Sequence, residues 1–232
     1  MKRRYLVTLG AVALSIVLGS GTARADNLVL GSGYNNIVTN LGTVGGGSFG
    51  QSTPDYLNGV VLPWVYCVDF FDHVDVPGTY IDATVTHNGT IAGSSANTTG
   101  LVSFGGTDGT LTLVENDVAV AWLLHNYATA AIGNTDLQIG LQGAIWHIIY
   151  GNIFLTGNST AAQSAYSADV TALGGAGSLT NYVGDYSWLS PAGAGNTPVD
   201  QGLVTVPDGG VTLMLLGGAL VGLETLRRRF RV

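Results

Sequence analysis

The sequence predicts an α+β fold, in which a β-sandwich or barrel-like sheet carries a small helical layer. An N-terminal signal peptide and a C-terminal transmembrane helix are expected to flank it. Before residue 115 the chain has short runs rich in β-branched and aromatic residues, separated by turn signals. After it, apolar residues recur at helical spacing. The 35 glycines among 232 residues suit a β-rich protein with many turns.

Strands are expected on both sides of the helical region. The strongest is the core strand 64–71, whose residues are mostly β-branched or aromatic. The other expected strands are 27–30, 36–39, 59–62, 79–86 and 186–189, the last within a β region over 180–205. Turns are expected at Pro77-Gly78 and Asn88-Gly89. Residues 90–110, rich in Ser, Thr and Gly, are expected to form loops or edge strands.

Three helices are expected between the strands. The first is capped at Glu115 or Asn116 and ends near Tyr127. The second begins with Thr135 and Gln138 as a capping box and stops at Gly151. The third starts at Ser159 and ends before Gly174. Trp64, Trp122, Trp146 and Trp188 are expected in the core.

The N-terminus has the three-part pattern of a secretory signal peptide. A basic cluster at 2–4 precedes an apolar run from Tyr5 to Leu18, and Ala23-Arg24-Ala25 forms an A-x-A cleavage site. We therefore expect residues 1–25 to be removed, so that the mature chain begins at Asp26. A membrane anchor is the alternative, although the apolar run is short for a bilayer span.

The C-terminal residues 206–232 have three parts in the order of a sorting tail. An apolar helix is expected over 211–226, between a Pro-containing signature and a basic cluster that would stay on the cytoplasmic side. The signature is Val206, Pro207, Asp208, Gly209 and Gly210, and the membrane stop is Arg227, Arg228, Arg229 and Arg231.

These parts resemble the PEP-CTERM class of sorting tails, in a form close to the Val-Pro-Asp-Ser-Gly variant. The resemblance implies transient anchoring in the inner membrane of a Gram-negative bacterium and processing by an exosortase-like protease. The product would then lie at the cell surface or outside the cell. An ordinary tail anchor that is never cut is the alternative.

Residues 26–205 are expected to form one extracellular domain with an acidic surface. They contain no Lys or Arg and thirteen of the fifteen acidic residues. Nucleic acid is excluded as a partner, because phosphate contacts need Lys and Arg. Amines and basic proteins are attracted instead. Enzymes that need a Schiff-base lysine or an arginine clamp are excluded as well.

Two motifs in this domain stand out together. Tyr66-Cys67-Val68-Asp69 lies on an expected strand and holds the single cysteine, and Gln142-Gly143-Ala144-Ile145-Trp146 lies on an expected helix. Their order, with the helix before Tyr127 between them, resembles the thioester domains of bacterial surface adhesins. The resemblance covers most of residues 60–190.

The resemblance implies an internal thioester between Cys67 and Gln142 that an external amine can open. This is single-use covalent attachment rather than turnover, so an enzyme is not expected. His125 and His147 are candidates for assisting the proton transfers. The alternative is a buried Cys and a helix Gln in a non-reactive structural protein of the extracellular matrix.

Other readings of the sequence remain open. A Cys–His pair would make an exported hydrolase, although Cys67 lies inside a strand and has no cation nearby in sequence. Asp69, Asp72 and Asp75 either bind Ca²⁺ or form a solvated acidic loop. No cofactor and no metal site are expected. The leading hypothesis is an adhesin-like or matrix protein whose partner is a surface polymer or an amine-bearing protein.

Overall fold

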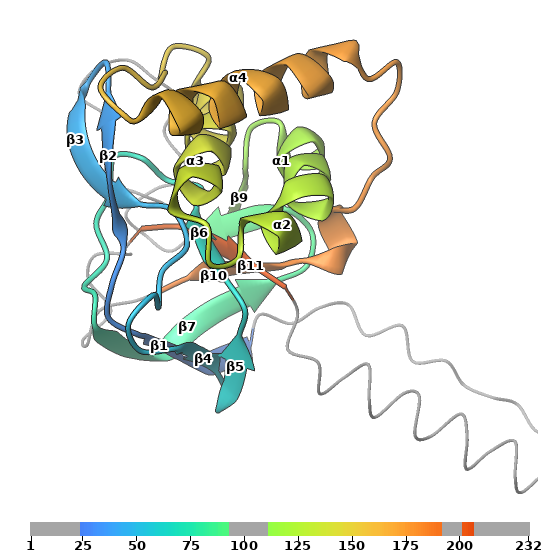
Figure 1. Cartoon of the computed structure of the whole chain (residues 1–232). Helices are drawn as coiled ribbons and strands as arrows, with labels where there is room; N and C mark the ends of the chain where they lie inside the picture. The colour runs from blue at the N-terminus through green and yellow to red at the C-terminus, as the bar shows by residue number, and fades with distance from the viewer. Residues whose placement is uncertain (1–23, 93–110, 192–200, 207–232) are drawn as a thin grey trace, which may run out of the picture.

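The computed structural model describes residues 24–92, 111–191 and 201–206, and these have a mixed α+β architecture (Figure 1). Within them, seven antiparallel strands form the main sheet, in the order β5-β4-β1-β7-β10-β11-β6. The strands are β1 (Arg24–Leu30), β4 (Asp55–Leu57), β5 (Val60–Leu62), β6 (Val65–Cys67), β7 (Gly78–Thr86), β10 (Ser187–Ser190) and β11 (Leu203–Thr205).

The two edge strands of this sheet are neighbours in the chain, which forces the sheet to curl. β5 ends at Leu62 and β6 begins at Val65, so only two residues join the two edges. A flat sheet of this size would separate its edges by about 29 Å, because neighbouring strands lie about 4.8 Å apart. The connection from Leu62 to Val65 reaches about 11 Å at most. The sheet is therefore nearly closed, and the expected barrel-like form is confirmed.

The helices form a layer on one side of the sheet (Figure 1). They are α1 (Asp117–Leu123), the π-helical turn η1 (Leu124–Ala128), α2 (Thr129–Ala131), α3 (Thr135–Tyr150), α4 (Thr160–Gly175) and the short 3₁₀ turn η2 (Val183–Asp185). α3 lies between α4 and the sheet. A methyl group on Gly140 would lie 2.6 Å from Ala165 Cβ, so this glycine lets α3 and α4 pack closely.

Two hairpins complete the described fold. One pairs β2 (Asn35–Thr39) with β3 (Gly42–Gly46), and the other pairs β8 (Thr90–Ala92) with β9 (Leu111–Leu113). The first packs against α3, where a methyl group on Gly46 would lie 2.7 Å from Trp146 Cη2. Trp64, Trp146 and Trp188 lie in the core, as expected, whereas Trp122 is half-buried against it.

The strand expected over 64–71 is much shorter than predicted. β6 stops at Cys67, because the next residues leave the regular ladder: the backbone N–H groups of Val68 and Asp69 both donate to Gly202 O, at 2.9 and 3.3 Å. The Asp69 carboxylate then accepts a hydrogen bond from the backbone N–H of Phe71, which turns the chain. The expectation of a long strand was wrong, since local composition carries no information about this turn.

Two helix boundaries also differ from the prediction. The first helix does not end near Tyr127 but continues through the π-helical turn to Ala131. The cap of α3 is Asn134, whose side chain accepts from Leu137 N, so Thr135 and Gln138 form no capping box. Gln138 instead bonds side chains outside its helix, because it is buried against neighbouring segments.

The signal peptide and sorting tail expected from the sequence lie outside the described residues, apart from Arg24, Ala25 and Val206. Most of the expected loop region 90–110 lies outside them too. In the described ranges, each helix is too short or too polar to cross a bilayer.

Candidate functional site

The edge strand β6 directs one backbone edge of Cys67 away from the sheet. Cys67 is paired with Leu203 of β11, while Val68 N donates to Gly202 O. Because successive residues of a strand alternate the direction of their N–H and C=O groups, the N–H and C=O of Cys67 point away from β11. That side is covered by α3, and Cys67 is fully buried there.

The side chain of Gln142 forms hydrogen bonds with this backbone edge. Its Oε1 accepts a hydrogen bond from Cys67 N at 2.9 Å, and its Nε2 donates to Cys67 O at 2.7 Å. Both residues are 0% exposed. The carboxamide of Gln142 therefore pairs with Cys67 as a neighbouring strand would. We call this arrangement the Cys67–Gln142 seam.

The position of Gln142 follows from how α3 is held. The helix begins at the Asn134 cap and ends at Gly151, whose φ of 73° is the left-handed conformation typical of a helix stop. Gln142 lies in the middle of this rigid element. One turn earlier, Gln138 Oε1 accepts from Asn35 Nδ2 at 3.1 Å, which ties the same helix to β2.

Burial makes the Cys67 thiol a weak acid. Desolvation raises the pKa of this thiol well above its ordinary value, and the nearby Asp69 carboxylate raises it further. The thiol is therefore protonated at neutral pH. Nucleophilic attack by Cys67 requires a group that accepts its proton as the sulfur reacts.

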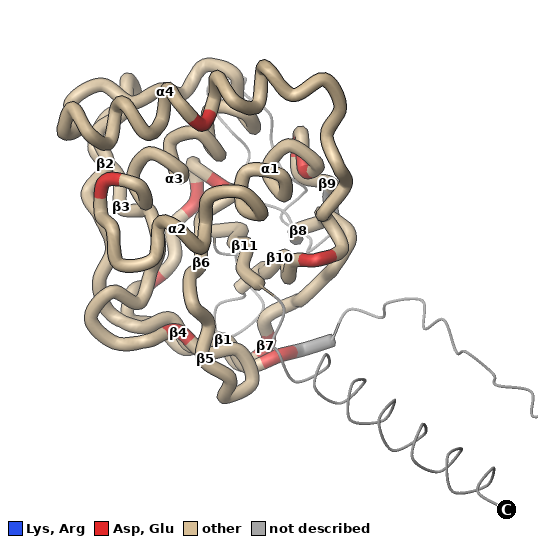
Figure 2. The backbone as a smooth tube through the Cα atoms, turned by 45° about the vertical axis from the view of Figure 1, so that its right-hand side comes forward, with Lys and Arg blue, Asp and Glu red and all other residues tan. Residues whose placement is uncertain are grey.

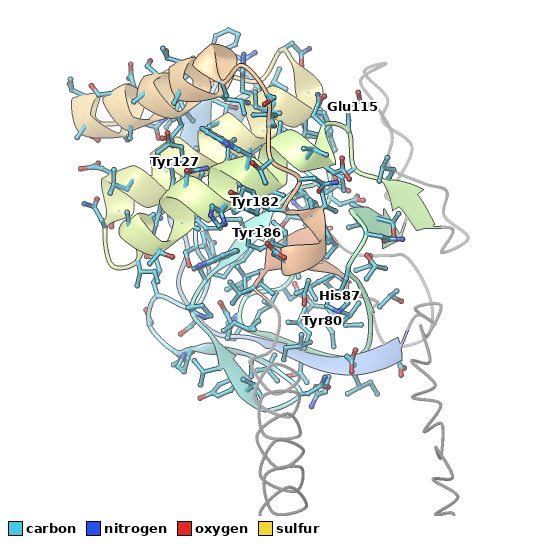
Figure 3. The ribbon with its side chains drawn as sticks, turned by 90° about the vertical axis from the view of Figure 1, so that its right-hand side faces the viewer. Tyr80, His87, Glu115, Tyr127, Tyr182 and Tyr186 are labelled. Carbon is cyan, nitrogen blue, oxygen red and sulfur yellow. The ribbon has the colours of Figure 1, made fainter. Side chains whose placement is uncertain are left out.

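The two candidate histidines, His125 and His147, make their contacts with residues other than Cys67. His125 is exposed and stacks on the ring of Tyr182, with centroids 3.7 Å apart. Tyr182 is labelled in Figure 3. His147 Nδ1 lies 3.0 Å from the carbonyl oxygen of Ile153. Neither contact supports a proton shuttle or a Cys–His nucleophile pair.

The acidic segment after β6 is only partly a solvated loop. Asp69 is 1% exposed, and its Oδ1 accepts from the Tyr150 hydroxyl at 3.3 Å. Among the described residues, no group of three or more His, Cys, Asp or Glu side chains is arranged to hold a metal ion. The described acidic residues lie on both the sheet side and the helical side of the molecule (Figure 2).

Three polar side chains of α3 lie near the seam in roles that are not expected from the sequence: Gln138, Trp146 and Tyr150. Gln138 and Trp146 are one turn before and after Gln142, so the i, i+4 spacing would have found them. The Tyr150 hydroxyl accepts from Phe70 N at 3.1 Å. No local pattern marks this contact, because the two residues are 80 positions apart.

The comparisons with known proteins found no relative of this chain. No protein-family model matches the chain, and neither the curated proteins nor the solved structures contain a match. The function of the chain is therefore inferred from its residues and their geometry.

Proposed function

We propose that this chain is an exported, adhesin-like surface or matrix protein that attaches covalently to amines through a Cys67–Gln142 thioester. The observation that carries the proposal is the double hydrogen bond between the Gln142 carboxamide and the Cys67 backbone. It brings the only cysteine of the chain next to a carboxamide that is fully buried.

The chemistry needs no cofactor. The Cys67 sulfur attacks Gln142 Cδ and forms a C–S bond, the C–N bond breaks, and the thiol proton leaves with the nitrogen as ammonia. An external primary amine then attacks the thioester carbonyl, forming an amide at Gln142 and returning the Cys67 thiol. Each protein molecule reacts once.

The geometry offers three contributions that favour this reaction. The Cys67 N–H already donates to Gln142 Oε1 at 2.9 Å, so a donor is in place for the oxyanion that develops on attack. A strand and a helix hold the two groups, which limits the loss of entropy on reaction. Burial of both residues excludes the water that would hydrolyse the product.

The two chain ends supply the rest of the proposal. Residues 1–25 would direct export, and residues 206–232 would anchor the chain in the inner membrane until an exosortase-like protease removes the tail. The domain left outside has no Lys or Arg, so its field attracts amine-bearing partners and it has no internal lysine to consume the thioester.

A purely structural role is the second candidate, and the same seam favours it. A buried strand edge needs partners for its N–H and C=O groups, and Gln142 supplies both. The raised pKa of Cys67 also favours an inert thiol. In that case the protein is a non-reactive component of the extracellular matrix.

Intact-mass measurement of the purified protein separates the two candidates. The thioester makes the chain one ammonia lighter than its sequence, and incubation with methylamine then adds one methylamine at Gln142. Cys67→Ala is the matched control, because Gln142 bonds only the backbone of Cys67 and the seam keeps both hydrogen bonds. A mass equal to the unmodified sequence, unchanged by methylamine, rejects the thioester and leaves the structural role.

Peptide mass spectrometry of material from the cell surface tests processing of the tail. Peptides containing Arg227–Arg231 should be missing from surface material if the tail is cut, and their recovery there would show a permanent anchor.

A further inference from the structure

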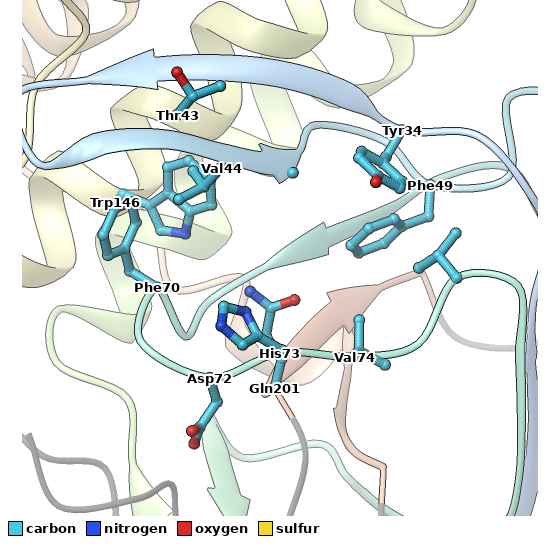
Figure 4. Close-up of a pocket in the computed structure, with 12 residues that line it drawn as sticks. Tyr34, Thr43, Val44, Phe49, Phe70, Asp72, His73, Val74, Trp146 and Gln201 are labelled. Atoms are coloured by element: carbon cyan, nitrogen blue, oxygen red, sulfur yellow. The ribbon is translucent and has the colours of Figure 1, made fainter.

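A cavity of about 320 Å³ is lined by residues of β3, of the segment 70–76 that follows β6, and of α3 (Figure 4). Its lining includes the aromatic residues Tyr34, Phe49, Phe70 and Trp146 and the polar residues His73 and Gln201. Figure 4 shows Trp146 and Phe70 at one end, Tyr34 and Phe49 at the other, and His73 with Gln201 between them. This volume is in the range of small-molecule sites.

The cavity has an open end and a closed end. Tyr34 is 48% exposed and forms the mouth, whereas Phe70 and Trp146 are buried. Trp146 lies one helical turn after Gln142, and Phe70 lies three residues after Cys67. A ligand in the cavity would therefore reach the neighbourhood of the seam from the side of β2 and β3.

The closed end contains a hydrogen-bond donor without a partner. Trp146 is fully buried, and its Nε1–H has no acceptor among the described residues. Trp188 is also fully buried, but its Nε1–H donates to Val183 O at 3.1 Å. Buried indole N–H groups normally find an acceptor, so the unpartnered one marks a place for an oxygen atom supplied from outside the chain.

The polar wall of the cavity is held in position by the backbone. Gln201 N donates to His73 O at 3.1 Å, and Gln201 Nε2 donates to Asp69 O at 2.7 Å. These bonds fix the carboxamide of Gln201 beside the His73 ring. The cavity therefore presents the hydrogen-bonding side chains of His73 and Gln201 between two aromatic ends.

The charges around the cavity disfavour anionic ligands. No Lys or Arg occurs between residues 26 and 205, and Asp72 lies on the cavity lining, so an anionic ligand finds no counter-charge. The ligand must bring an oxygen acceptor for the indole, apolar faces for the rings, and further hydroxyl groups for His73 and Gln201. A pyranose ring meets all three demands.

We propose that this cavity binds one uncharged saccharide unit, with a sugar oxygen accepting from Trp146 Nε1–H and the C–H faces of the ring packed on the aromatic side chains. The binding is non-covalent. It goes beyond the thioester proposal, because it uses neither the Cys67 thiol nor the Gln142 carboxamide.

The test is a titration followed by the indole N–H signals in ¹H–¹⁵N spectra of the purified protein. The probes are glucose, galactose and N-acetylglucosamine, with glucuronate as the anionic comparison. We expect at least one neutral sugar to shift the Trp146 signal, with a weaker effect of glucuronate. The Trp188 signal should stay in place, since its N–H is already bonded within the protein.

Matched variants test whether the sugar binds in this cavity. Trp146→Phe keeps an aromatic ring but removes the donor, and it should weaken sugar binding about tenfold. Trp188→Phe should leave the affinity unchanged. Tyr34→Ala, at the exposed mouth, weakens binding with little risk to folding and serves if Trp146→Phe fails to fold. Cys67→Ala should bind sugar as the parent does, which separates this proposal from the thioester.

Two results would overturn the proposal. One is the absence of any shift of the Trp146 signal at millimolar concentrations of all three neutral sugars. The other is an equal or larger response to glucuronate, which would show that the cavity does not select uncharged ligands.

Discussion

The two edge strands of the curled sheet, β5 and β6, satisfy their outward-facing backbone N–H and C=O groups in different ways. At the β5 edge, Val60 and Val61 are 38% and 55% exposed, and water can satisfy the outer backbone groups. At the β6 edge, Val65, Tyr66 and Cys67 are fully buried, and the Gln142 carboxamide bonds both the N–H and the C=O of Cys67. A buried edge therefore needs a side chain that imitates a strand, whereas an exposed edge does not.

The two sides also differ in the charge of their buried polar groups. Gln142 at the β6 edge is neutral. On β4, next to β5, the 1%-exposed Asp55 accepts from Gly31 N at 2.7 Å, and burial raises its pKa to about 6. We therefore expect the hydrogen bonds between Cys67 and Gln142 to be insensitive to pH and the hydrogen bond between Gly31 and Asp55 to respond to it.

The largest effect is expected from Gln142→Leu. This change leaves the N–H and C=O of Cys67 buried without partners, at a cost of about 4 kcal/mol in the free energy of unfolding. Urea denaturation should measure it in the Cys67→Ala background, where no thioester can contribute. The comparison variant is Val61→Thr at the exposed edge, for which we expect a change of about 0.5 kcal/mol or less. Similar losses for both variants would show that the β6 edge has no special need of Gln142.

A smaller effect is expected where α3 is seated against α4. Gly140→Ala places a methyl group 2.6 Å from Ala165 Cβ and 2.9 Å from the backbone nitrogen of Tyr166. The helices must separate, which should cost about 2 kcal/mol in thermal or urea unfolding.

Gly174→Ala is the matched control for that change, because it lies in α4 with no atom within 4 Å of the new methyl group. Alanine is the better helix former, so this variant should gain up to about 1 kcal/mol. A loss in both variants would contradict close packing as the reason for Gly140.

The smallest effect concerns pH. Because the folded state holds the proton of Asp55 more tightly than the unfolded chain does, its stabilising contribution is present below about pH 4 and is lost as the pH rises through about 6. We expect the free energy of unfolding to fall by about 1 to 2 kcal/mol over this window from this group. Asp169 on α4, with a pKa raised to about 6 by burial, adds a decrease of the same sign.

Asp55→Asn tests this assignment, because the amide oxygen keeps the acceptor for Gly31 N but does not titrate. Urea unfolding between pH 4 and 7 should show a shallower decrease for this variant than for the parent. An unchanged slope would mean that Asp55 is not the group responsible.

Local sequence signals locate many of the helices and strands. Alternation located β7, the Ser159 cap located the start of α4, and Gly151 located the end of α3, because these signals depend on neighbouring residues alone. The expected thioester pairs Cys67 with Gln142, and the structure places the Gln142 carboxamide within hydrogen-bond distance of the Cys67 backbone.

The surroundings of Cys67 and Gln142 depend instead on contacts between distant segments of the chain. The early end of β6, its place at the sheet edge and the unpartnered indole of Trp146 all depend on contacts between residues far apart in the chain. The helix of Gln142 could be read from its periodicity, but periodicity does not say which strand it meets. The curl of the sheet determines which strand α3 meets, because it brings the β6 edge under α3 and leaves β5 exposed.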